Sequence, residues 1–168
     1  MLHAASSGRD RAPGAAARAP SVPPPCTPDG GDPLDVTLAS DVSLVEPVVA
    51  AVVARCEAHG YAPRVCHLNV PVALSEALAN AIVSGNGGDP AKAVRVRACV
   101  DAGGVVLEVT DQGAGFELDA CAARGDEDDF LEREGGRGLF LMRRLMDEVE
   151  HFRSPAGGSV VRMTLRRT

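Results

Sequence analysis

Two short boxes and one helix carry the residue types in this chain that could do chemistry. The boxes are Asp111-Gln-Gly-Ala-Gly-Phe116 and Glu134-Gly-Gly-Arg-Gly-Leu139, and an upstream helix carries Glu76 and Asn80 four residues apart. A carboxylate can accept a hydrogen bond from the amine of a base, and glycines let the backbone approach a ligand closely. Together these parts indicate a nucleotide site.

Strand periodicity gives the Asp111 side chain a direction. Alternation places Asp111 on the same face as Val105 and Val109, so its carboxylate points toward a helix layer. An unpaired ionised acid there costs several kcal/mol as an order of magnitude, and the exocyclic amine of adenine is one suitable donor. The same parity brings the Ser159 hydroxyl into this layer. The alternative is that Asp111 caps the loop after its strand and Ser159 belongs to a turn.

The glycines of the two boxes have different expected roles. Gly113 and Gly115 permit close approach and unusual dihedral angles, although such a pair occurs in many turns. Gly135, Gly136 and Gly138 stand just ahead of a helix, where free N–H groups and the helix dipole form an anion site. The alternative is an ordinary flexible loop that enters a helix.

Glu76 and Asn80 share one helix face, nearly opposite the apolar row that contains Leu74 and Leu78. In an isolated helix this spacing indicates only a solvated polar face. Beside the glycine boxes it indicates more, because an amide oxygen suits Mg²⁺, which needs few protein ligands when phosphates supply the rest. Glu76, one turn away, could then orient or deprotonate an incoming hydroxyl.

The sequence excludes the common phosphate-binding motifs. Lys92 is the only lysine and lies beside Pro90 in a loop, so neither a phosphate-loop lysine nor the strand lysine of the usual protein-kinase fold is present. A third glycine is also missing after Gly113 and Gly115, which excludes the dinucleotide fingerprint. Phosphate charge must therefore be met by backbone amides, Mg²⁺ and Arg137.

Composition bounds the class of protein. The length of 168 residues suits one domain, and the net charge of −6 argues against direct nucleic-acid binding. No apolar stretch of membrane-spanning length or signal peptide is expected, which argues against a membrane protein. The cysteines lack zinc spacing and are expected to be free thiols in a reducing cytoplasm. They are Cys26, Cys56, Cys66, Cys99 and Cys121.

The chain divides into a tail and one folded domain. Residues 1–33, rich in Ala and Pro, are expected to be disordered, and residues 34–168 to fold. Residues 115–136, with an acidic run, are expected to form a long mobile lid. Five strands and three helices predict a two-layer α/β sandwich, a mainly antiparallel mixed sheet with helices on one face. The strands are expected near 34–38, 94–100, 105–109, 149–153 and 160–165, and the helices at 42–56 with a break near Pro47, at 71–83, and after Gly138 through Leu139, Met142, Met146 and Val149.

The ordered set of three motifs resembles the GHKL ATPases, the superfamily of gyrase, heat-shock chaperones and histidine kinases. The motifs are Glu76-Ala-Leu-Ala-Asn80-Ala-Ile, the Asp111 box, and Gly135-Gly-Arg-Gly-Leu-Phe-Leu-Met. Within the superfamily the chain is most similar to the bacterial anti-sigma factor serine/threonine kinases, over about residues 34–168. The resemblance implies the Bergerat ATP-binding fold, with residues 115–136 as its lid.

The resemblance also implies a role for each motif residue. Asp111 would bind adenine, Gly113 and Gly115 would shape the pocket, and Asn80 would coordinate Mg²⁺, with Glu76 as the catalytic base. The segment that lines the phosphates would comprise Gly135, Gly136, Arg137, Gly138 and Leu139, and Ser159 would contribute its hydroxyl.

Members of the resembled family bind a sigma factor or phosphorylate a serine or threonine of a small antagonist protein, and they are often homodimers. Ser84 stands where relatives commonly have a histidine, which bears on kinase activity more than on ATP binding, and Ser159 replaces a frequent threonine. One alternative is an ATP-gated module that holds a partner without phosphorylating it. Another is the catalytic piece of a histidine kinase, although the short, Pro-rich tail is not expected to form the helical hairpin that would carry a phosphorylatable histidine.

Overall fold

The computed structural model describes residues 32–113 and 136–167. They form a five-stranded sheet in the order β1-β2-β3-β5-β4, with each neighbouring pair antiparallel. The predicted two-layer α/β sandwich is therefore confirmed. The described sheet contains no parallel pair, so it is antiparallel and not mixed as predicted. The strands are β1 (Asp32–Ala39), β2 (Ala93–Val100), β3 (Gly104–Thr110), β4 (Glu148–Arg153) and β5 (Ser159–Arg166).

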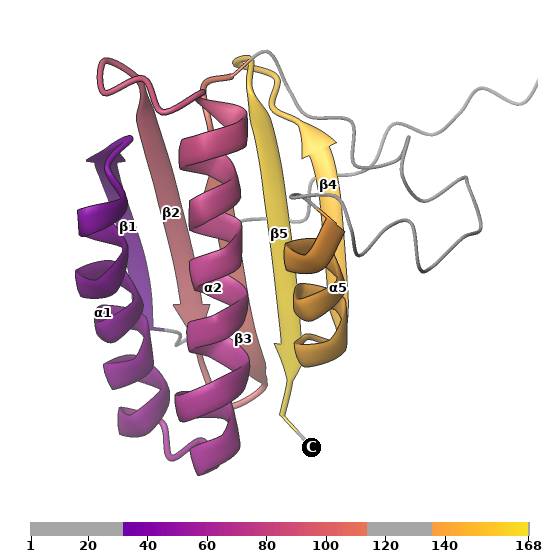
Figure 1. Cartoon of the computed structure of the whole chain (residues 1–168). Helices are drawn as coiled ribbons and strands as arrows, with labels where there is room; N and C mark the ends of the chain where they lie inside the picture. The colour runs from indigo at the N-terminus through magenta and orange to yellow at the C-terminus, as the bar shows by residue number, and fades with distance from the viewer. Residues whose placement is uncertain (1–31, 114–135, 168) are drawn as a thin grey trace, which may run out of the picture.

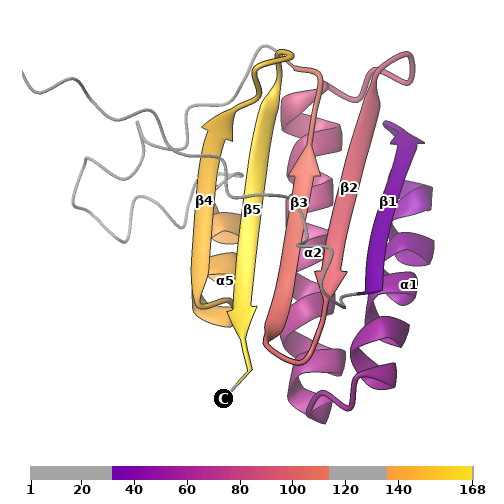
Figure 2. The same ribbon diagram turned by 180° about the vertical axis from the view of Figure 1, so that it is seen from behind.

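Three α-helices of the described chain cover one face of the sheet and leave the other open (Figure 1). Figure 2 shows the open face, on which the strands lie side by side with no described helix over them. The core fills the space between the layers, where alternate strand residues such as Val96 and Leu107 are fully buried beneath Leu74 and Leu78. The helices are α1 (Val45–Ala58), α2 (Val70–Ala79) and α5 (Gly136–Leu145).

Both hairpins lie where the turn residues predict them. In the β2–β3 turn, the Asp101 side chain accepts hydrogen bonds from the N–H groups of Gly103 and Gly104. In the β4–β5 turn, Gly157 and Gly158 have φ values of +91° and +82°, which only glycine adopts without strain. Strand β1 begins at Asp32, two residues before the predicted start, because its first residues pair with the end of β2.

The helix boundaries correct three predictions. Pro47 lies in the first turn of α1 and does not interrupt it, because N–H groups there have no helical partner to lose. The second helix begins at Val65, before Pro71, since a π-helical turn at Val65–Asn69 precedes α2 and widens the backbone ahead of the proline ring. Val149 belongs to β4, so the third helix is one turn shorter than its apolar spacing predicts.

The helical run Val65–Gly85 corrects the expectation that the chain has no apolar stretch of membrane-spanning length. It comprises 21 residues with a mean hydropathy of 1.2, so by length and composition it could cross a membrane. In the structure it is the central helix of the domain (Figure 1), and its apolar side, including Leu74, Leu78 and Ile82, is buried in the core. Burial against the sheet accounts for its composition.

One row of opposite charges crosses the open face of the sheet. Register places Asp35, Arg97, Glu108, Arg162 and Glu150 side by side on the five strands. Consecutive members pair: Asp35–Arg97 at 4.0 Å, Arg97–Glu108 at 3.0 Å, Glu108 with Arg162, and Arg162–Glu150 at 3.9 Å. Glu108 and Arg162 are 7% and 3% exposed, although strand alternation predicts an outward, solvated Glu108. The pairing explains how charged groups are tolerated there.

We expect Glu108→Ala to lower the free energy of unfolding by about 3–5 kcal/mol, because it removes the buried carboxylate that pairs with both Arg162 and Arg97. Urea denaturation measures the change. Glu148→Ala is the matched control, since the Glu148–Arg166 pair is solvent-exposed and such pairs contribute about 0–1 kcal/mol. Equal effects of the two substitutions would show that the buried Glu108–Arg162 pair stabilises the fold no more than the exposed pair does.

Candidate functional site

Asp111 follows the last residue of β3 and is held by backbone groups. Its Oδ1 accepts hydrogen bonds from the N–H of Gly113 at 2.8 Å and from the N–H of Ser159 at 3.1 Å. The Asp111 N–H in turn donates to the Ser159 carbonyl at 3.0 Å. The residue is only 6% exposed, so the predicted inward direction of the carboxylate is confirmed. These bonds fix the orientation of the acid.

The second carboxylate oxygen of Asp111 is left for another donor. Among residues 32–113 and 136–167, no donor forms a hydrogen bond with Oδ2. Oδ2 lies toward Gly85 at the end of the central helix, where a Cβ would stand 2.6 Å from it. The absence of a side chain at Gly85 therefore allows the carboxylate to pack against the end of the central helix. A buried carboxylate oxygen in this situation is suited to bind an amine N–H.

The Ser159 hydroxyl is a second unused polar group beside Asp111. Ser159 is 2% exposed, and its Oγ has no hydrogen-bond partner within the described part of the chain. A buried hydroxyl left unsatisfied costs about 1–3 kcal/mol. An acceptor and a hydroxyl side by side match the mixed donor and acceptor edge of a purine, so both observations fit an adenine site.

Glycines make the close approach around Asp111 possible. A Cβ on Gly113 would overlap the carbonyl oxygen of Gly85, and a Cβ on Gly158 would overlap the carbonyl oxygen of Asp111. The ends of the central helix, of β3 and of the β4–β5 turn can meet only because these side chains are absent. Motif spacing predicts a site role for Gly113, but it predicts none for Gly85 or Gly158.

Asn86 is a structural residue of the site that sequence reasoning missed. It is 1% exposed, and its Oδ1 accepts the N–H of Gln112 at 2.8 Å. Its Nδ2 donates to Ser40 Oγ at 2.6 Å and to the Ala93 carbonyl at 3.0 Å. One amide thus connects the end of the central helix with the ends of β1, β2 and β3. The surrounding Ser-Gly-Asn-Gly-Gly segment is typical of a helix end and does not indicate these contacts.

Glu76 and Asn80 lie against the second glycine box. A Cβ on Gly138 would stand 2.7 Å from Glu76 Oε2 and 3.3 Å from Asn80 Nδ2. Gly138 is buried in the first turn of α5, and α2 and α5 lie side by side in Figure 1. The structure thus brings the acid, the amide and the start of a helix together, although they are far apart in sequence. Free N–H groups and the positive end of the helix dipole favour an anion here.

One helix connects the two halves of the site. The run from Glu76 to Gly85 spans roughly 13 Å at 1.5 Å per residue, with the acid near one end and Asp111 beside the other. Its last part, Asn80–Gly85, is π-helical, a feature that often marks functional sites. This separation suits an extended nucleotide with its base at Asp111 and its terminal phosphate at Gly138.

The structure describes only some of the remaining predicted site residues. Gly115, Gly135 and the lid lie outside the described residues. Gly136 is the first residue of α5, and Arg137 is exposed. The Leu139 side chain is 1% exposed in the core, so only its backbone could face a ligand.

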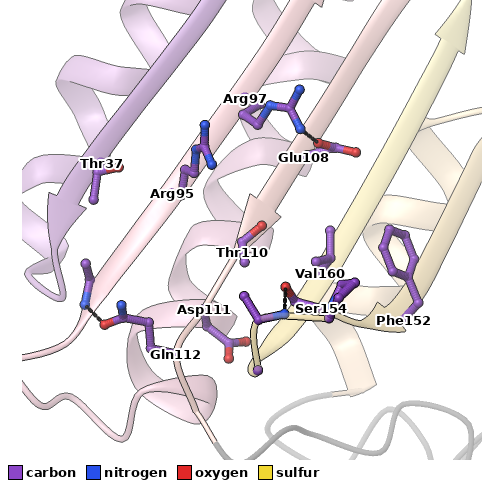
Figure 3. Close-up of a pocket in the computed structure, with 14 residues that line it drawn as sticks. Thr37, Arg95, Arg97, Glu108, Thr110, Asp111, Gln112, Phe152, Ser154 and Val160 are labelled. Atoms are coloured by element: carbon purple, nitrogen blue, oxygen red, sulfur yellow. Dashed lines mark hydrogen bonds and ion pairs between the residues drawn. The ribbon is translucent and has the colours of Figure 1, made fainter. Parts of the chain in front are cut away.

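A hollow of about 430 Å³ lies on the open face of the sheet and shares Asp111 with this site (Figure 3). Outward side chains line it, among them Arg95, Arg97 and Phe152, with Asp111 and Gln112 at its edge. It lacks the catalytic candidates of α2 and the glycines of α5 among its described lining residues.

Cysteine chemistry does not compete with this assignment. Cys56 and Cys66 are buried free thiols, and Cys99 is buried as well. Burial raises the pKa of the Cys56 thiol to about 11 and also raises that of Cys66, so both stay protonated at neutral pH. Cys26 and Cys121 lie outside the described residues.

We expect Gly113→Ala to destabilise the chain by about 1–3 kcal/mol or more, because its Cβ would force the end of β3 away from the Gly85 carbonyl. Urea denaturation with nucleotide titration measures both consequences. Gly103→Ala is the matched control, since its Cβ would meet only the Asp101 side chain, at 3.3 Å. A stable Gly113→Ala protein that binds ATP normally would refute the close approach.

Comparison with known proteins agrees with this geometry. Residues 38–165 match the histidine kinase-like ATPase domain family. The anti-sigma F factor of Bacillus cytotoxicus is 31% identical over 130 residues, which cover 76% of this chain and 85% of that protein. The anti-sigma F factor of a Thermoanaerobacter species is 32% identical over 97 residues, or 57% of this chain and 67% of that protein.

A solved structure shares the fold. The RsbU and RsbW domains of Rv1364c from Mycobacterium tuberculosis align with a TM-score of 0.56 and 21% identity, over 82% of this chain and 33% of that one. At this identity the likeness concerns the fold alone. The chain therefore belongs to the histidine kinase-like ATPase superfamily, in the branch that contains the anti-sigma F factors.

Proposed function

We propose that this protein is an ATP-dependent protein serine/threonine kinase that acts as an anti-sigma factor and phosphorylates an antagonist protein. The observation that carries the proposal is the contact of Gly138 with Glu76 and Asn80, beside the first turn of α5. The similarity to anti-sigma F factors supports the choice of partners, a sigma factor and its antagonist. The proposal locates the protein in the cytoplasm, as a homodimer.

The residues present fit ATP and Mg²⁺. Ser159 Oγ, which has no partner among the described residues, and Asp111 Oδ2, which takes no part in the bonds to Oδ1, suit adenine. The start of α5 with Arg137 suits phosphates. The Asn80 amide oxygen is the protein ligand available for Mg²⁺, which would neutralise phosphate charge when bound.

In the proposed reaction Glu76 accepts the proton of the partner's hydroxyl group. The hydroxyl oxygen forms a bond to the γ-phosphorus as the bond from that phosphorus to the β,γ-bridging oxygen breaks, and ADP leaves with the electron pair. Glu76 is half-buried on a rigid helix and lies against Gly138, so its carboxylate is aimed at the place where the phosphate chain would end. Positioned proton transfer of this kind contributes about 10²–10⁴-fold in rate.

One sequence feature favours a second candidate function. Ser84, where members of the resembled family commonly have histidine, is exposed at the end of the central helix. An ATP-gated module that holds its partner without phosphorylating it would need the same nucleotide site. In that case ATP would change partner affinity while no phosphoprotein formed.

We expect Asp111→Asn to weaken ATP binding on the order of 10²-fold, because an unmatched buried donor costs about 1–3 kcal/mol. Two N–H groups already bind Oδ1, so the asparagine oxygen would occupy that position and its NH₂ group would face the adenine amine. The affinity for inosine triphosphate, which carries an acceptor at position 6 of its base, should fall less. Isothermal titration calorimetry measures both ligands, with the exposed Asp89→Asn as control, and undiminished ATP affinity in Asp111→Asn would rule out the adenine assignment.

We expect Glu76→Gln to reduce phosphoryl transfer by about 10²–10⁴-fold while Mg²⁺-ATP affinity changes little, because the amide cannot accept the hydroxyl proton. Labelled ATP and a candidate antagonist from the same genome provide the assay. Glu57→Gln, on the exposed side of α1, is the control. Unchanged transfer by Glu76→Gln would remove this residue from the mechanism, and absence of transfer by the wild-type protein with intact ATP binding would favour the gated module.

A further inference from the structure

The outward side of α5 carries large apolar and basic side chains together. Phe140 and Leu141 are 42% and 36% exposed, and Arg143 and Arg144 are exposed beside them. At roughly 100° per residue these four side chains lie within an arc of about 160°, opposite the buried residues Leu139 and Met142. We call these four residues the α5 outer face. Figure 1 shows α5 on the outside of the helix layer, next to α2.

The arginines of this face differ from those of the sheet. Arg95, Arg97, Arg162 and Arg166 each form an ion pair with a carboxylate. Within residues 32–113 and 136–167, Arg143 and Arg144 form none. The guanidinium of Arg144 instead lies 5.7 Å from the centre of the Phe140 ring. Within the described part of the chain, neither of these two cations is paired with a carboxylate, although the net charge of the protein is −6.

The helix dipole explains only part of this arrangement. Cations in the last turn of a helix stabilise it by about 0.3–1 kcal/mol, which favours arginine at positions 143 and 144. The dipole does not explain why two large apolar side chains lie exposed to water beside the same arginines. Arginine and aromatic residues are enriched in protein interfaces, where apolar contact and directed charge occur together.

We propose that the α5 outer face docks an acidic, amphipathic helix of a partner protein. The apolar side of that helix would cover Phe140 and Leu141, and its carboxylates would pair with Arg143 and Arg144, as Arg–carboxylate pairs commonly do. The inference rests on the proposed function, since it names the surface that holds the partner. The patch is small, so the interface is of the weak, transient class.

A protein fits this face better than a nucleic acid or a membrane. Phosphate backbones are bound by several clustered cations on a basic surface, whereas this chain is acidic overall and the face offers two arginines. Membrane-surface helices likewise need a broad basic side and a continuous apolar side. In α5 the large buried residues face the core, and the exposed apolar side chains stand among the cations.

Docking here would bring the partner close to the proposed chemistry. The α5 helix begins at Gly136, and Gly138 lies against Glu76 and Asn80. Phe140 and Leu141 are within one turn of Gly138 along the helix, so a partner on the face would contact the same short helix that packs against Glu76 on its other side. The same short helix would thus serve the phosphates at its start and the partner along its side.

A synthetic helical peptide tests the proposal on the full chain. The probe has about 15 residues, with Leu at positions i, i+3, i+4 and i+7 and Glu between them, and the matched peptide has Lys for Glu. Fluorescence anisotropy measures affinity, and ¹⁵N NMR locates the bound peptide. We expect the Glu peptide to bind at least about tenfold more tightly than the Lys peptide, a difference of about 1.4 kcal/mol, with shifts centred on α5.

Two variants remove the two kinds of contact separately. Arg143→Gln with Arg144→Gln removes charge, and Leu141→Ser removes apolar contact. Each variant should bind the Glu peptide at least about tenfold more weakly than the wild-type chain does. Lys92→Gln with Arg153→Gln, an equal charge change elsewhere, should change affinity less than twofold by the same measure. Equal binding of the two peptides to the wild-type chain would overturn the proposal, as would full affinity in both α5 variants.

Further measurements separate the other partners and the proposed function. A random-sequence DNA duplex and anionic lipid vesicles are the competing probes for this face. If either bound more tightly than the Glu peptide does, and if that binding required Arg143 and Arg144, the choice of a protein partner would be overturned. Mg²⁺-ATP calorimetry on the same proteins should give unchanged affinity in the α5 variants. Failure of the wild-type chain to bind ATP would contradict the proposed function, whereas failure to distinguish the peptides would contradict only the docking surface.

Discussion

The site depends on the close approach of three backbone segments around Asp111. Gly85, Gly113 and Gly158 stand where any side chain would separate these segments or fill the space before the carboxylate. This approach lets two N–H groups bind Oδ1, and so leaves Oδ2 oriented and available. A carboxylate with a single fixed direction can distinguish an amine from a carbonyl oxygen, which a rotating side chain on the surface could not do.

The central helix has both a structural and a chemical role. Its apolar side fills the core, and its other side carries Glu76 and Asn80. Since packing against the sheet fixes the helix, the distance from Glu76 to the Asp111 corner is set by the core and not by a loop. Asn86 extends this control by joining the helix end to three strand ends through one buried amide.

Local rules predicted much of the fold and part of the site. Period-two alternation located β2 and β3 and gave Asp111 its direction, because the parity of a strand continues one residue beyond its end. The same rule places Glu108 on the open face but does not indicate its burial, since it contains no information about the arginines that register places on each side of it. Gly85 and Asn86 were missed for a similar reason: their function lies in contacts with β3, and a helix-stop pattern does not indicate which strand end will meet the helix.

The arrangement of α5 shows why the two halves of the site need not respond alike to change. Asp111 is held by strand ends and a turn, whereas Gly138 sits on a ten-residue helix that packs on α2 and β4. A force on the outer side of α5 would reach Gly138, and through it Glu76 and Asn80, before it reached the Asp111 corner. A displacement of this helix would therefore alter the proposed phosphate end of the site before the Asp111 corner, whereas a surface substitution that leaves the helix in place would alter neither.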